Sequence, residues 1–381
     1  MDPFAPSSTS PPAALATAGV IDNARLARAK PAYTTRFVSR LIAENPVGFG
    51  LSTDTLLVPS AGDIVLARVD EIGQHARIEL PGGRRASLYA GDEILVAYGD
   101  RYAPDQFEAE VPADLGPAHL VAAGGVAARV LSAHQLMKPA TEITPIGLLV
   151  DAFGRVTLSR CAPHVLGESR RAATATCPLV IAVIGTSMNA GKTTALASVA
   201  RGLCAAGRRV AAGKVTGTGA GGDTHLFVDS GARPVLDFTD FGFASTYRLA
   251  PDQVRAIFVA LLAELGREGP DAIVIEIADG LLQRETARLI SEPVFAASVD
   301  HVVFAAGDAV GAAFGCAHLA AAGLPVAAVS GRLTSSPLAT AEARRAIQLP
   351  VLSIDELASA AVSDLLPSRR PMTSGAARAA G

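Results

Sequence analysis

Residues 185–194 read Gly-Thr-Ser-Met-Asn-Ala-Gly-Lys-Thr-Thr. They follow a run of apolar residues at 179–184, Leu-Val-Ile-Ala-Val-Ile, and they precede a helix-forming stretch at 195–206. A glycine-rich turn between a buried strand and a helix start presents backbone N–H groups to anionic phosphates, and glycine lets the backbone approach them closely. The segment therefore predicts a phosphate-binding loop of the P-loop type.

The polar groups of this loop have expected roles. Lys192 is expected to reach the β- and γ-phosphates of a nucleotide, and the Thr193 hydroxyl to complete the shell of a Mg²⁺ ion. The strict pattern G-x-x-x-x-G-K-S/T fails at its first position, where Thr186 stands, so the loop is one residue longer. The competing interpretation is a glycine-rich turn with a solvated lysine. The residues expected to bind the nucleotide are Thr186, Ser187, Asn189, Ala190, Gly191, Lys192, Thr193 and Thr194.

With its longer loop, the segment resembles the dethiobiotin-synthetase-like branch of P-loop NTPases, whose loop reads Gly-Thr, four residues, then Gly-Lys-Thr. The resemblance covers about residues 178–355. It implies a second lysine in a Lys-Pro-Val motif after the next strand, and Lys214 stands there, followed by Val215 in place of the proline. Lys192 and Lys214 are therefore the expected catalytic residues. The alternative for Lys214 is an exposed lysine at a strand end.

The resemblance also implies an acid at the end of a later strand. The corresponding run, residues 273–280, reads Ile-Val-Ile-Glu-Ile-Ala-Asp-Gly. A carboxylate at the carboxyl end of a central parallel strand faces the crevice where such sheets bind ligands. Glu276 is therefore the candidate metal ligand, and Asp279 is the alternative.

A glycine-rich stretch at 219–225 lies between the second lysine and this acid. The family places a metal-binding aspartate in this region, so Asp223 is a candidate second contact to Mg²⁺, and Asp237 is another acid for that role. A different interpretation has Asp223 capping the helix that follows. His225 is a candidate base or substrate contact, although a lone histidine is more often structural.

The fold class is α/β, a doubly wound and mostly parallel sheet forming a P-loop NTPase domain, preceded by a smaller β-rich domain of barrel or sandwich type. Apolar runs separated by helical stretches indicate parallel strands buried on both faces. They stand at 179–184, 209–212, 272–275, 301–305, 325–329 and 351–354. Short β-type runs stand at 63–69, 76–80, 85–89 and 93–98. The expected domains are a disordered tail at 1–30, the β-rich domain at 31–175, the P-loop domain at 178–366 and a second tail at 367–381.

Composition limits the partners and the setting. Lys+Arg 33 against Asp+Glu 36 gives a net charge of −3, which provides no general attraction to nucleic acid or to an anionic membrane. Residues 309–331 are uncharged and long enough to span a bilayer, but their glycines and a Gly-Leu-Pro turn favour a buried helix, a turn and a strand. Four cysteines without a Cys-x-x-Cys pair favour a cytoplasmic protein over a disulfide-stabilised one.

The leading hypothesis is an enzyme that uses ATP and Mg²⁺ to phosphorylate or activate a small molecule at a carboxylate or carbamate oxygen, of the ligase or kinase type. The alternative is a regulatory or delivery NTPase whose hydrolysis switches a protein partner. Ser187 replaces an aspartate of dethiobiotin synthetase itself, which indicates a different substrate. The expected partners are a small-molecule substrate and a second copy in a homodimer. ATP is the default nucleotide, because no Asn-Lys-x-Asp guanine signature is present.

Overall fold

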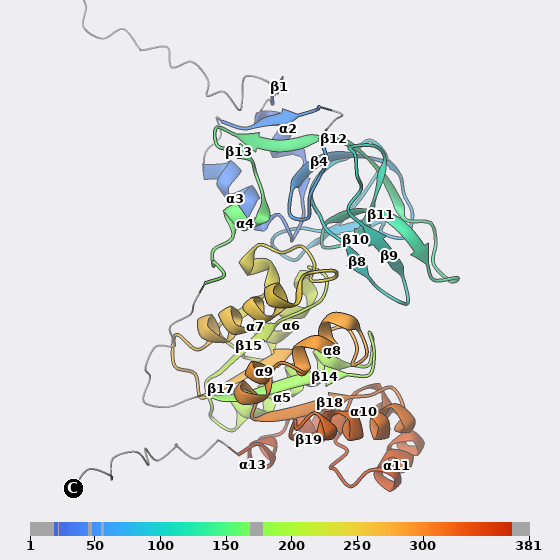
Figure 1. The fold of residues 1–381 in the computed structure, drawn as a ribbon, viewed down its shortest axis with the longest axis vertical. Coiled ribbons are helices and arrows are strands. Elements are labelled where there is room, and N and C mark those ends of the chain that lie inside the picture. The colour runs from blue at the N-terminus through green and yellow to red at the C-terminus, as the bar shows by residue number, and fades with distance from the viewer. Residues whose placement is uncertain (1–18, 22, 45–47, 55–56, 168–177, 368–381) are drawn as a thin grey trace, which may run out of the picture. The chain divides into compact units, whose positions relative to one another are not determined.

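The computed structural model describes residues 19–21, 23–44, 48–54, 57–167 and 178–367 (Figure 1). Of the tails expected at 1–30 and 367–381, residues 1–18 and 368–381 lie outside these residues, as does Cys177. The chain forms two compact units. The β unit comprises Met1–Val165, Thr218–Gly221 and Thr239–Ser245, and the P-loop unit comprises Leu166–Gly217, Gly222–Phe238 and Thr246–Gly381.

The P-loop unit is built on a six-stranded sheet in which every pairing is parallel. In spatial order the strands are β16 (Val235–Asp237), β15 (Val210–Lys214), β17 (Ala272–Glu276), β14 (Leu179–Gly185), β18 (His301–Ala305) and β19 (Val326–Ser330). The strand of this sheet that comes first in sequence, β14, lies near the centre, between β17 and β18. The predicted α/β class with a parallel sheet is therefore confirmed.

Helices cover both faces of this sheet, which explains why its strands are mostly apolar, with polar residues mainly at their ends. Leu179, Ile181 and Val183 share one buried cluster with residues of α5 (Lys192–Ala205). The opposite face meets α7 (Pro251–Leu265): a Cβ added to Gly213 would lie 2.9 Å from Leu261 Cδ2. The other helices are α6 (Gly221–Asp229), η1 (Phe238–Phe241), α8 (Arg284–Ile290), α9 (Pro293–Ser298), α10 (Ala309–Ala321), η2 (Arg332–Ser335), α11 (Pro337–Ala346), α12 (Ile354–Ala358) and α13 (Val362–Leu365).

The strand predicted at 351–354 is wrong. Only an isolated bridge joins Val351 to Val329. Ser353 then begins α12 with a capping box, in which its side chain accepts from the Glu356 N–H and the Glu356 side chain accepts from the Ser353 N–H. This local capping stops the chain from continuing as a strand.

The uncharged stretch at 309–331 forms α10, a turn and β19, as predicted. Its helix is only partly buried, because Val310 and Phe314 are exposed. None of the described helices is both long and apolar enough to cross a membrane.

The β unit contains a closed ring of five strands. In order around the ring they are β12 (Thr141–Asp151), β4 (Ile64–Glu71), β7 (Glu93–Tyr98), β11 (Val126–Ala133) and β10 (Ala118–Ala122), which pairs back with β12. Ring closure removes sheet edges, and the predicted barrel is confirmed in this form. The remaining strands are β1 (Gly19–Val20), β2 (Lys30–Pro31), β3 (Gly50–Ser52), β5 (Arg77–Glu79), β6 (Arg85–Ser87), β8 (Arg101–Tyr102), β9 (Phe107–Glu110) and β13 (Gly154–Arg155).

The N-terminal tail was predicted to extend to residue 30, which is wrong for residues 19–30. This stretch carries β1 and the helix α2 (Asn23–Arg28), and Leu26 and Ala29 are buried in the core of the β unit. Arg25 donates to both carboxylate oxygens of Glu93, at 2.9 and 3.1 Å from Nε. A segment that buries apolar side chains and forms a two-point ion pair is ordered even though its composition is typical of a tail. The next helix, α3 (Arg36–Glu44), was also not anticipated.

Two short segments from the second half of the chain belong to the β unit. Thr218 forms a bridge with Ser245, and the Gly219 N–H donates to the Ala244 carbonyl at 2.9 Å. Arg36 donates to Asp240 at 2.6 Å, with both side chains largely buried. Asp240 therefore forms a structural ion pair. The β unit is therefore not one continuous stretch of the chain, because it includes these two later segments.

His75 generates a prediction about acid stability. Burial lowers the pKa of His75 from its ordinary 6.5 to about 4, and the charge of Arg101 adds to this effect. Between these values the unfolded chain binds a proton that the folded β unit does not, so the full stability is present above pH 6.5 and is lost as the pH falls towards 4. We expect an acid-induced loss of about 2 to 3 kcal/mol from this group.

Urea unfolding of the wild type and His75→Gln at pH 7.5 and 4.5 measures this loss, and the variant should lose less stability on acidification. An NMR titration of the His75 ring with a midpoint near 6.5 would contradict the prediction.

Candidate functional site

The loop between β14 and α5 has the shape that the sequence predicts for a phosphate-binding turn. Asn189 and Gly191 adopt left-handed backbone conformations, with φ of 62° and 95°, and Gly191 is the N-cap of α5. A Cβ added to Gly191 would lie 3.1 Å from the Gly331 Cα, so the position has little room for a side chain. The amides at the start of α5 therefore open onto the carboxyl edge of the sheet, where anions bind favourably.

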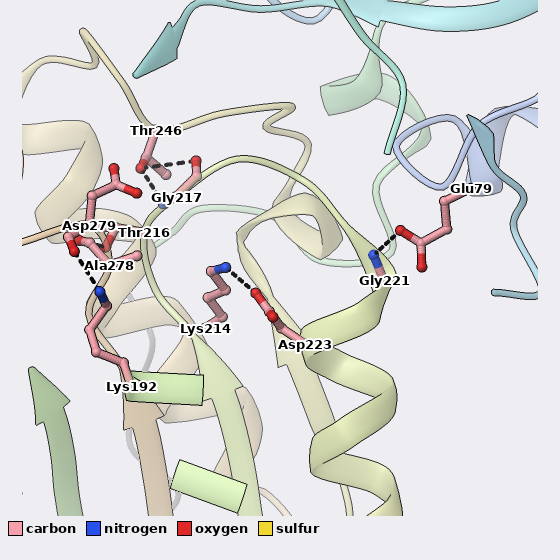
Figure 2. A network of polar contacts seen from close by, with 10 residues as sticks. All are labelled: Glu79, Lys192, Lys214, Thr216, Gly217, Gly221, Asp223, Thr246, Ala278 and Asp279. Atoms are coloured by element: carbon pink, nitrogen blue, oxygen red, sulfur yellow. Dashed lines mark hydrogen bonds and ion pairs between the residues drawn. The ribbon is translucent and has the colours of Figure 1, made fainter. Parts of the chain in front are cut away.

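Lys192 folds back over this loop. Its side chain is buried, with 5% of the residue exposed, and Nζ donates to the carbonyls of Ser187 at 2.8 Å and Asp279 at 2.5 Å (Figure 2). Burial lowers the pKa of Lys192, while the carboxylates of Glu276 and Asp279 oppose that change. The ammonium group thus links the loop to the segment that follows β17.

Lys214 stands at the carboxyl end of β15, in register with an acid on each neighbouring strand. It pairs by register with Glu276 of β17 and with Asp237 of β16. Its ammonium forms an ion pair with Asp223, in the first turn of α6 (Figure 2). Burial alone would lower the pKa of Lys214, but Asp223 and Glu276 outweigh burial and raise it. Lys214 is therefore a buried, fully charged group, and the expectation of an exposed lysine is wrong.

Glu276 carries the feature that most clearly points to a ligand. Only 2% of the residue is exposed, and among the described residues its Oε2 atom is buried without a hydrogen-bond partner. Burial raises the pKa of Glu276, whereas Lys214 and a hydrogen bond from Thr193 act in the opposite direction. A buried carboxylate oxygen without a partner costs about 1 to 3 kcal/mol or more, so such an atom calls for an explanation.

Magnesium matches these donors. Mg²⁺ prefers oxygen ligands, takes one or two carboxylates and completes its shell with water and phosphate oxygens. Thr193 and Glu276 lie in contact at the start of α5 and the end of β17, and both supply oxygen. No group of three histidine, cysteine or acidic side chains suited to a metal occurs in the described part of the chain. The Thr193 hydroxyl and the Glu276 carboxylate could hold the ion. Asp223 is nearby, in its ion pair with Lys214.

The structure places the other predicted residues as follows. Thr186, Ser187 and Thr194 lie in or beside the loop, and Ser187 and Thr194 are exposed. Asp279 contributes its backbone carbonyl to Lys192. His225 is exposed on α6.

Three threonines that the sequence analysis did not select hold the segments around the lysines. The hydroxyls of Thr216 and Thr286 both donate to the Ala278 carbonyl at 2.5 Å. The Gly217 N–H donates to the Thr246 hydroxyl at 2.8 Å (Figure 2). The two bonds to Ala278 fix the loop after β17, on which the Lys192 contact depends, and the Gly217–Thr246 bond holds the turn after β15. Thr216 lies beside Lys214 in sequence, but nothing local marks Thr246 or Thr286.

Together the sheet order, the strand-loop-helix geometry and the buried lysine make the second unit an α/β domain with a phosphate-binding loop of the P-loop type. The chain has no match among protein-family models or among curated proteins.

Several solved structures are similar to part of the chain. The signal recognition particle receptor FtsY from Elizabethkingia anophelis is 21% identical, with a TM-score of 0.29, over 43% of this chain and 53% of its own. This chain thus spans about half the length of that structure. The chloroplast FtsY from Physcomitrella patens is 14% identical, with a TM-score of 0.35, over 53% of this chain and 69% of its own.

The septum site-determining protein MinD from Pyrococcus horikoshii OT3, complexed with Mg-ADP, is 16% identical, with a TM-score of 0.32, over 47% of this chain and 82% of its own. These TM-scores are too low to transfer any activity to this chain. None of the three structures is a dethiobiotin synthetase.

Gly331 provides a test of the loop geometry. A Cβ at this position would lie 2.4 Å from the Ala190 carbonyl oxygen, so Gly331→Ala must displace the loop. We expect nucleoside triphosphate binding, measured by fluorescence titration, to weaken about tenfold or more. Gly323→Ala is the matched control, because Gly323 also has positive φ but has open space around its Cα. Equal affinity in both variants would contradict the proposed position of the phosphates.

Proposed function

We propose that this protein binds a nucleoside triphosphate with Mg²⁺ at the carboxyl edge of its parallel sheet, cleaves the γ-phosphate bond, and uses the cleavage as a regulatory switch. The observation that carries the proposal is the buried, unpartnered Oε2 of Glu276, close to two buried lysines and the phosphate-binding loop. Two ammonium groups suit the charge of a triphosphate, and the free carboxylate oxygen suits its metal.

The chain's own residues would act mainly by position and charge. Lys192 already lies over the loop, so its ammonium needs to exchange backbone carbonyls for phosphate oxygens. Lys214 keeps its proton because Asp223 and Glu276 surround it. When bound, Mg²⁺ would neutralise charge on the phosphate oxygens, held by Thr193 and Glu276. At an effective dielectric constant of 20, each ammonium at about 4 Å from a phosphate contributes about 4 kcal/mol of attraction.

The hypothesis of a regulatory switch is favoured by the path of the chain between Lys214 and Asp223. Lys214 and Asp223 belong to the P-loop unit, yet residues Thr218–Gly221 between them belong to the β unit. A change at the phosphates that moves Asp223 is therefore passed directly along the backbone to the β unit.

A second candidate function is phosphorylation or activation of a small molecule, at a carboxylate or carbamate oxygen, with ATP as the nucleotide. The observation that favours it is Lys214, which matches the second lysine of the dethiobiotin-synthetase-like family and is buried beside the acids. Purified protein with Mg²⁺-ATP or Mg²⁺-GTP separates the two functions. Stimulation of phosphate release by a small-molecule extract supports the enzyme, whereas stimulation only by a protein fraction, or by self-association into a homodimer, supports the switch.

Lys192→Ala tests nucleotide binding. At about 100 times Kd, a bound nucleotide stabilises the wild type by about 2.7 kcal/mol, which gives a measurable rise in the melting temperature. This rise should disappear in Lys192→Ala and persist in the control Lys138→Ala, which removes an exposed lysine. An unchanged thermal shift in Lys192→Ala would exclude the assigned site.

Glu276→Gln tests the metal side. The amide keeps the shape but loses the charge, so the hydrolysis rate at saturating Mg²⁺-nucleotide should fall about 100-fold. Glu285→Gln is the matched control, since Glu285 is also buried but accepts hydrogen bonds from the Arg248 backbone N–H and the Gln283 side chain. If Glu276→Gln hydrolyses nucleotide at the wild-type rate, Glu276 does not hold the metal.

A further inference from the structure

The stretch between Lys214 and Asp223 joins the nucleotide site to the β unit. These two residues form an ion pair at the site, and only nine positions separate them. The chain leaves the P-loop unit after Gly217 and re-enters it at Gly222. The intervening residues, Thr218–Gly221, are part of the β unit.

This segment is held in the β unit without spare room. A Cβ added to Gly124 would lie 1.9 Å from the Gly219 carbonyl oxygen, and one added to Gly219 would lie 2.8 Å from Thr34 Cγ2. The Gly219 N–H also donates to Ala244 at 2.9 Å. Close-packed atoms have little room to move independently. We therefore expect the segment to move only together with its neighbours in the β unit.

Glu79 holds the end of the segment. It lies on β5 with 2% of the residue exposed, and its Oε2 accepts the Gly221 N–H at 3.0 Å (Figure 2). Gly221 is the first residue of α6, so Glu79 satisfies one of the amides that a helix leaves without an internal partner. Glu79 is itself fixed through its backbone, donating to Ala123 at 2.8 Å and accepting from Tyr33 at 2.7 Å.

Asp223 follows two residues later, in the first turn of the same helix. The ion pair between Asp223 and Lys214 therefore depends on where α6 begins. The first residue of α6 is Gly221, and Glu79 holds its N–H. A shift of Asp223 away from Lys214 towards a bound metal or phosphate must strain the bond between Gly221 and Glu79 or carry Glu79 along.

We propose that Glu79 is a positioning residue of the nucleotide site: it sets the first turn of α6, thereby places Asp223 against Lys214, and makes β5 of the β unit respond to the nucleotide. The inference rests on the proposed function and adds its regulation. It predicts that the catalytic step and the response of β5 depend on Glu79, while binding of the nucleotide itself does not.

Steady-state kinetics separates this role from simple stability. In Glu79→Ala, kcat should fall about tenfold or more while the nucleotide Kd stays within about threefold. Glu79→Gln keeps an acceptor oxygen for Gly221 and should restore kcat to within about threefold of the wild type. Asp63→Ala removes another buried acid of the β unit, whose partners are Ser60 and Arg155, and should lower the melting temperature without changing kcat. Equal kcat in Glu79→Ala and the wild type would overturn the proposal.

Hydrogen exchange measures the response directly. With a slowly hydrolysed Mg²⁺-triphosphate, exchange should change in residues 77–87 as well as in 185–195 of the wild type. In Glu79→Ala the response of 77–87 should be lost while that of 185–195 remains. An unchanged response of 77–87 in the variant, or its absence in a wild type whose residues 185–195 respond, overturns the role of Glu79. If residues 185–195 do not respond in the wild type, the proposed function fails and the inference fails with it.

A second variant covers the case in which Glu79→Ala does not fold. Gly221→Ala keeps Glu79 but places a Cβ 2.8 Å from the Tyr33 ring, so the start of α6 must move away from its present position. The same fall in kcat with retained Kd is expected, and a wild-type kcat in a folded Gly221→Ala protein would overturn the proposal.

Discussion

Opposite charges buried at the carboxyl edge of the sheet constrain the structure around them. Lys214 and Glu276 lie side by side on neighbouring strands, and Asp223 closes the ion pair from α6. Removing one partner from a buried pair costs about 3 to 5 kcal/mol, because the remaining charge stays buried without compensation. The register of β15 with β17 and the start of α6 must therefore be correct at the same time.

The sheet around these charges is built mainly from apolar residues. The strands carry small and branched residues on both faces, and glycines allow close approach where backbones meet, as Gly213 does against α7 and Gly191 against Gly331. A rigid sheet of this kind holds charged side chains at its carboxyl edge with little freedom to relax. The buried Oε2 of Glu276, which has no hydrogen-bond partner among the described residues, is the atom that the proposed metal site would use.

The backbone passes from the P-loop unit into the β unit and back at two places. The ring of strands in the β unit is complete without the second half of the chain, yet the unit incorporates Thr218–Gly221 and Thr239–Ser245. Both segments follow strands of the P-loop unit, after β15 and after β16, at the edge where its ligand would bind.

The sequence by itself determined the α/β class and indicated a β-rich unit and a phosphate-binding loop, because each strand, helix or turn signal involves residues close together in the chain, whereas it left open whether the β-rich unit is a barrel or a sandwich. An apolar run, a glycine turn and a lysine at a helix start form a local pattern with a local structure. Only the tertiary structure decided that residues 19–21 and 23–30 are part of the β unit, that Thr286 bonds to Ala278, and that Glu79 bonds to Gly221. Glu79 and Gly221 are 142 positions apart, and no local pattern records a hydrogen bond between them.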